Sequence, residues 1–119
     1  MDAVLEFLPR LGAILTLIIG FIGFFRPQLF TEKMGIQLNG PEAFSEIRAV
    51  MGGMNIGTSA AALLLNSPLV YITLGVAWFF LLLARLYSMA VDGGTLKQSL
   101  PGIVVDGVIA ALFLSGFWQ

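Results

Sequence analysis

The chain has 119 residues, of which 58% are hydrophobic and 11% charged, and its formal net charge is -1. A soluble domain carries about 25% charged residues, and so small a domain cannot bury this much apolar surface, so the composition predicts a chain solvated by lipid. The near-neutral net charge gives no indication of a nucleic-acid-binding surface. The sequence contains no Cys and no His, which excludes disulfides, thiol chemistry and zinc or haem sites ligated by these residues. We expect a non-enzymatic protein without a metal or other cofactor.

The first predicted helix covers about residues 4–25. It contains an uncharged run from Leu11 to Phe25, and about 20 apolar residues suffice to cross a bilayer. Glu6 and Arg10 lie four residues apart and can pair at the water edge. Arg26-Pro27 ends the segment. Its acidic beginning favours a retained helix over a signal peptide.

Residues 28–44 form the only extended polar stretch of the sequence. Gly35, Asn39-Gly40 and Pro41 punctuate it with turn signals. Several apolar residues remain within it, which indicates a short interfacial helix followed by a turn. An ordinary loop is the alternative.

Two helices follow in a long uncharged stretch. Residues 49–84 carry no charge and are too many for one crossing, and Asn66-Ser67-Pro68 divides them. This predicts helices over about 45–65 and 69–91.

A fourth helix is predicted over about 101–117. Asp92-Gly93-Gly94-Thr95 breaks the chain before it, Pro101 suits its first turn, and Trp118 suits an interfacial anchor. The predicted fold is therefore all-α, a four-helix transmembrane bundle that forms a single domain over residues 1–119.

The basic residues predict the orientation of this bundle. One side carries Arg10 alone, and the other carries the rest: Arg26, Lys33, Arg48, Arg85 and Lys97. Because basic residues concentrate on the cytoplasmic side, we expect a multi-pass protein of the bacterial inner membrane with both termini on the periplasmic side.

Small residues recur at every fourth position of the second long helix. They are Ala49, Gly53, Gly57 and Ala61. Such a face lets two membrane helices approach closely. We interpret it as a packing face within the bundle, with a docking groove for another protein's helix as the alternative.

Three charged residues lie in or just inside apolar segments: Arg48, Arg85 and Asp106. A charge in a bilayer is costly unless it is paired or hydrated. Arg85 and Asp106 lie roughly 8 Å inside the same boundary of two helices joined by a short loop. The sequence therefore predicts an ion pair between them.

These charges belong to a larger predicted cluster of polar residues. Arg48, Gly52, Asn55 and Ser59 share one helical face, and Arg85, Ser88 and Asp92 share another. If the faces meet, they form a polar cluster in the cytoplasmic half, made of Glu46, Arg48, Asn55, Arg85, Ser88, Asp92 and Asp106.

The cluster has two competing interpretations. In the structural one, the charges neutralise each other and fix helix register, and shallow arginines extend to water. In the functional one, the cluster is a half-open pocket for an anionic or quinone-like headgroup or a lipid phosphate, which the donor fork of arginine suits. A proton path would need a carboxylate free to change charge, which a tightly paired Asp106 resists.

Two sequence elements also carry a family resemblance. Ser45-Glu46-Ile47-Arg48 opens the second long helix, and Arg85-Leu86-x-Ser88-x-x-x-Asp92-Gly93 closes the third. With an acidic residue in the last helix, this set resembles a bacterial family of small four-helix membrane proteins of unknown function, DoxX/DoxD-like. The resemblance implies an accessory membrane subunit or a quinone-coupled context, and it supplies no catalytic residues.

Three functions are consistent with these observations. The first is an accessory or assembly subunit of a larger inner-membrane complex, with the lipid bilayer and other membrane subunits or a second copy as partners. The second is a membrane binding or quinone-linked redox component with an arginine-lined pocket. The third is a small multidrug-type transporter, which Glu6 disfavours because a proton-coupled carboxylate should lie deeper than the end of a helix.

Overall fold

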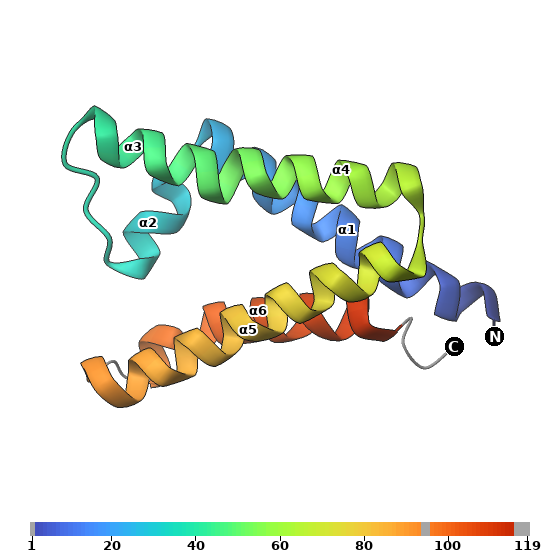
Figure 1. Cartoon of the computed structure of the whole chain (residues 1–119). Helices are drawn as coiled ribbons and strands as arrows, with labels where there is room; N and C mark the ends of the chain where they lie inside the picture. The colour runs from blue at the N-terminus through green and yellow to red at the C-terminus, as the bar shows by residue number, and fades with distance from the viewer. Residues whose placement is uncertain (1, 94–95, 116–119) are drawn as a thin grey trace. The chain divides into compact units, whose positions relative to one another are not determined.

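The chain is all-α, as predicted. The computed structural model describes residues 2–93 and 96–115, and helices make up almost all of them (Figure 1). In chain order these are α1 (Asp2–Phe25), α2 (Gln28–Met34), α3 (Pro41–Ile47), the π-helical stretch η1 (Arg48–Met54), α4 (Asn55–Leu65), α5 (Pro68–Asp92) and α6 (Leu96–Leu114). Because α3, η1 and α4 follow each other without a break, they form one helical run.

Two helices within the described residues are long and apolar enough to cross a membrane, by length and composition. They are Val4–Phe25 in α1 and Pro68–Asp92, which is α5. The apolar part of α6, Ser99–Leu114, is shorter. The predicted count of four crossings therefore stays a prediction for the other two segments.

Glycine and proline residues mark several helix boundaries. Gly35 and Gly93 end α2 and α5 in left-handed conformations, with φ of 74° and 78°, which glycine adopts without a steric penalty. Pro41 and Pro68 stand in the first turn of α3 and α5, where the missing N–H costs nothing. These ends correspond closely to the turn signals in the sequence.

Two predicted helix beginnings differ from the structure. The second long helix begins at Pro41 rather than at 45, because proline suits the first turn. The last helix begins at Leu96 rather than at Pro101, so that Pro101 lies inside it and removes one hydrogen bond close to its N-terminus. The predicted helix end at 117 and the anchor Trp118 lie outside the described residues.

Contacts divide the chain into two compact units. The first unit combines Met1–Gly12 with Leu65–Gln119, and the second is Ala13–Leu64. Both units include part of α1.

In the first unit, α5 and α6 lie side by side in opposite directions (Figure 1). The largest buried side chains on them are Tyr71, Trp78, Ile109 and Phe113. A Cβ at Gly75 would lie 2.7 Å from the side chain of Leu114, so only glycine lets α6 approach α5 this closely. The two helices that a short loop joins are therefore neighbours, as the predicted ion pair requires.

In the second unit, α1 packs against η1 and the beginning of α4. A Cβ at Gly52 would lie 2.5 Å from the Cα of Phe24, and one at Gly20 would lie 2.8 Å from the backbone nitrogen of Ile56. Ser59 and Ala62 continue the buried face along α4.

The predicted small-residue packing face is not the one that the second unit uses. Ala49, Gly57 and Ala61 are exposed, and Gly53 is half-buried. A Cβ at Gly57 would meet no atom within 4 Å, and one at Gly53 would meet only its own helix at 3.9 Å. Small residues occupy both sides of this helix, and within the second unit α1 packs on the side that carries Gly52. A packing role for the predicted face elsewhere in the bundle stays a prediction.

Candidate functional site

The predicted ion pair between α5 and α6 is present. Nε of Arg85 donates to Oδ2 of Asp106 at 2.8 Å. The Asp106 side chain is 4% exposed, whereas the Arg85 side chain is 26% exposed. The carboxylate therefore lies inside the first unit, and the guanidinium reaches its surface.

Gly102 provides the space for this guanidinium. A Cβ at Gly102 would lie 2.6 Å from both Cζ and Nη1 of Arg85, so the guanidinium lies directly against the backbone of α6. Gly102 and Asp106 are one helical turn apart, which places the backbone contact and the carboxylate on one face of α6. Any larger residue at position 102 would displace Arg85.

Arg48 has a different role, at the end of α1. Its Nη1 donates to the carbonyl oxygen of Phe24 and, at 3.4 Å, to that of Phe25. The last carbonyls of a helix have no intrahelical donor, and Pro27 just beyond this end has no N–H to offer. A cation at a helix C-terminus is also favoured by the helix dipole. Arg48 therefore caps α1, and its guanidinium also lies 5.8 Å from the ring centre of Phe44.

The polar residues after Arg48 satisfy their hydrogen bonds within their own helix. Nδ2 of Asn55 donates to the carbonyl of Met51 at 2.8 Å, and the Ser59 hydroxyl donates to the carbonyl of Asn55. Such bonds to the preceding turn let polar side chains lie in an apolar helix interface. The predicted polar face with Gly52, Asn55 and Ser59 is thus the face that packs against α1.

The other acidic residues of the predicted cluster lie at the surface. The Ser88 hydroxyl donates to Oδ2 of Asp92 at 2.7 Å, one turn along α5, and both residues are exposed. Glu46 is exposed as well. Within residues 2–93 and 96–115, Arg85–Asp106 is the one ion pair.

The predicted cluster is therefore divided between the two units. Glu46, Arg48 and Asn55 belong to the second unit, whereas Arg85, Ser88, Asp92 and Asp106 belong to the first. The convergence of the two groups on one pocket stays a prediction. Within each unit, the hydrogen bonds described above favour the structural interpretation for Arg48, Asn55, Ser88, Asp92 and Asp106. They do not involve Glu46, and they engage only Nε of Arg85.

A further polar network was not predicted. Oδ1 of Asn66 accepts hydrogen bonds from Nε of Arg10 at 3.1 Å and from the hydroxyl of Tyr71 at 2.9 Å. Asn66 takes a left-handed φ of 45°, which asparagine tolerates better than most residues. Within the described residues, Arg10 bonds to Asn66 and does not form the predicted ion pair with Glu6. The turn signal Asn66-Ser67-Pro68 was visible in the sequence, but the partner of Asn66 was not.

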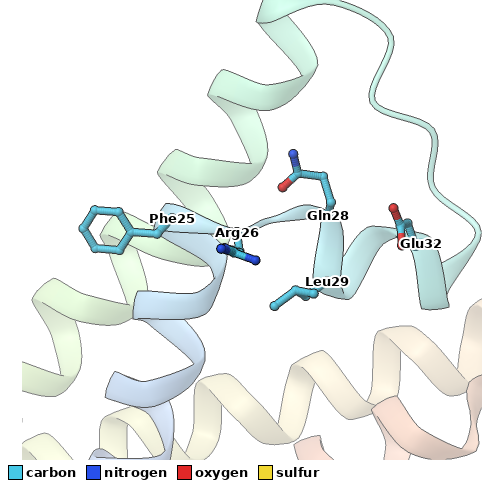
Figure 2. A pocket seen from close by; sticks show the side chains of 5 residues that line it. All are labelled: Phe25, Arg26, Gln28, Leu29 and Glu32. Atoms are coloured by element: carbon cyan, nitrogen blue, oxygen red, sulfur yellow. The ribbon is translucent and has the colours of Figure 1, made fainter.

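A shallow hollow lies at the junction of α1 and α2. Phe25, Arg26, Gln28, Leu29 and Glu32 line it. Figure 2 shows that Phe25 points away from the other four side chains, so the hollow is open rather than enclosed. None of the predicted site residues lines it.

These features define an all-α protein with two candidate membrane-crossing helices and an ion pair between neighbouring helices. The chain belongs to the family described as "Domain of unknown function (DUF4345)", whose model matches residues 4–117. Comparison with curated proteins and with solved structures finds no match. The family match does not extend to the DoxX/DoxD-like group, so that relation stays a prediction.

Proposed function

We propose that this protein is a non-enzymatic integral membrane protein that serves as an accessory subunit of a larger membrane complex. Its helices support the membrane location. In the most apolar 18-residue window of α5, 17% of the residues are buried, and in that of α1 33%. A core helix of a soluble protein would be largely buried, and contiguous exposed apolar surface of this kind marks contact with lipid or a partner.

The accessory role rests on one observation, the outward face of α4 and η1. This small-residue face consists of Ala49, Gly53, Gly57 and Ala61, and α1 packs on the other side of the same helical run. In lipid, helices gain little from burying apolar side chains, so small residues serve chiefly to let another helix approach. A face of this kind that the second unit's own helices leave uncovered suits a helix from a partner subunit.

A site-directed crosslink tests this role. The sequence has no Cys, so Gly57→Cys gives a single attachment point for a benzophenone maleimide. Illumination in native membranes should then yield one adduct of defined mass, because the probe lies on the small-residue face. Val76→Cys serves as the control, since Val76 is an exposed residue of a different helix, α5, with 45% of its surface accessible.

The masses distinguish the possible occupants. A discrete adduct larger than the chain at position 57, and none at 76, supports a partner subunit, and an adduct of twice the chain mass identifies that partner as a second copy. Attachment within the same chain leaves the mass unchanged and contradicts the accessory role. A solitary monomer in several mild detergents contradicts it as well.

A further inference from the structure

The guanidinium of Arg85 is only partly used by its ion pair. Nε makes the bond to Asp106, and within the part of the chain that the structure describes no hydrogen bond involves Nη1 or Nη2. Because the carboxylate lies beside Nε, the opposite end of the guanidinium keeps its terminal N–H donors. An arginine presents five N–H donors in all, so most of them need acceptors from outside these residues.

The position of this free end is fixed rather than variable. The guanidinium is held on one edge by Asp106 and on one side by the backbone at Gly102. A side chain that is 26% exposed reaches the surface without extending freely into it. The remaining donors therefore point in a direction that the protein sets, which lowers the entropy lost when an acceptor binds.

The depth of Arg85 indicates which acceptors are available there. Asp92 ends α5 and lies seven positions after Arg85, about 10 Å along the helix axis. A helix of 25 residues is about 37 Å long, longer than the ~30 Å hydrocarbon core. If α5 crosses the bilayer, its end extends into the headgroup layer and the backbone of Arg85 lies several ångströms inside the hydrocarbon boundary. From that depth the long arginine side chain can bring its guanidinium toward the headgroup layer, where lipid phosphates are found.

We propose that the free end of the Arg85 guanidinium binds a phosphate group, that of a phospholipid headgroup, while Asp106 and Gly102 hold the guanidinium in place. Paired N–H donors match two phosphate oxygens in a planar fork, which lysine cannot reproduce. A neutral quinone carbonyl would offer one acceptor and no charge, so the fork favours phosphate. The lipid source rests on the membrane location proposed above; the phosphate chemistry does not depend on a partner subunit.

Native mass spectrometry of the detergent-solubilised full chain tests the site. The probes are phosphatidylglycerol, inorganic phosphate, and diacylglycerol, which has the same chains without the phosphate. We expect the unaltered protein to retain phosphatidylglycerol, and Arg85→Lys to bind it about tenfold more weakly through loss of one charge-assisted bond. Arg85→Lys keeps the charge beside Asp106, so the variant should still fold.

Two further variants make the result specific to this side chain. Gly102→Ala should also weaken retention, because the added Cβ displaces the guanidinium without removing it. Arg26→Lys makes the same exchange at an exposed arginine and should leave retention unchanged. Equal binding of both phosphatidylglycerol and inorganic phosphate by the unaltered protein and Arg85→Lys would overturn the proposal, as would diacylglycerol retention that depends equally on Arg85.

The probes also separate the two sources of phosphate. Saturable, Arg85-dependent binding of inorganic phosphate alone supports the site and identifies a free phosphate group as its ligand. Binding of phosphatidylglycerol without binding of inorganic phosphate supports a lipid headgroup. Both results are independent of the crosslink at position 57, so failure of the accessory role and failure of this site are observed separately.

Discussion

At the scale of single residues, Arg48 provides hydrogen-bond donors for the last carbonyl groups of α1. Replacing Arg48 by Met keeps an unbranched, flexible side chain, although a shorter one, and removes the donors to Phe24 and Phe25. We expect the free energy of unfolding to fall by about 1–3 kcal/mol, the usual contribution of hydrogen bonds from a charged donor. Titration with a denaturing detergent, followed by circular dichroism, measures this change.

Two matched variants separate the cap from the charge of Arg48. Arg48→Lys keeps one donor and should lose less stability than Arg48→Met. Arg26→Met removes an exposed arginine at the same end of α1 and should change the unfolding free energy by no more than a few tenths of a kcal/mol. A loss for Arg26→Met equal to that for Arg48→Met would show that stability depends on positive charge near this helix end and not on the hydrogen bonds of the cap.

The sequence predicted the ion pair of Arg85 with Asp106 but not the cap that Arg48 forms on α1, for a physical reason. Arg85 and Asp106 lie at equal distances from the same short loop, so counting residues along two helices was enough to pair them. The cap by Arg48 depends on which helix end comes alongside it, and nothing in the spacing of Arg48 and Phe24 along the chain gives that. The sequence left open whether the ion pair uses all the donors of Arg85, because this depends on which edge of the guanidinium the carboxylate occupies.

At the scale of secondary-structure elements, two adjacent glycines in η1 have opposite roles. Gly52→Ala places a methyl group 2.5 Å from the backbone of Phe24, so α1 and η1 must separate. We expect a loss of about 1–3 kcal/mol, typical of overpacking, or a failure to fold. Gly53→Ala meets only its own helix at 3.9 Å and should be tolerated, with a change of at most about 1 kcal/mol.

Unfolding of the two variants under the same conditions provides the comparison, and each variant is the control for the other. Equal losses would mean that α1 does not pack on the Gly52 face. A greater loss of stability for Gly53→Ala would support the packing face that the sequence predicted.

The elements themselves were more predictable than their faces. Apolar runs, Pro and Gly marked the ends of α1, α4 and α5 to within a few residues. The π-helical stretch η1 was not predicted, because its residues have no distinctive composition. A π-helix places more residues in each turn than the α-helical 3.6. Residues four apart therefore follow a different path around the helix in η1 than in α4, and their spacing alone did not identify the side that packs against α1.

At the scale of the whole molecule, the orientation in the membrane is testable at two positions. The distribution of Lys and Arg predicts that Lys33 lies on the cytoplasmic side and the turn at Ser67 on the periplasmic side. In the Cys-free chain, we expect a membrane-impermeant maleimide to label Ser67→Cys in intact cells, and Lys33→Cys only after the membrane is opened. Labelling of both variants in intact cells, or the reverse order, would contradict the predicted orientation.

The Arg85–Asp106 contact also has a consequence for how the chain enters a bilayer. The apolar part of α6 is short. If α6 crosses a bilayer, as the sequence predicts, it would alone carry a bare carboxylate into hydrocarbon, at a cost of about 2.5–3.5 kcal/mol for an aspartate at the helix centre. Partnered with α5, the same carboxylate would enter as half of a neutral pair. Under the predicted topology, the two helices would therefore gain most by leaving the insertion machinery together, as a preformed hairpin, rather than one after the other.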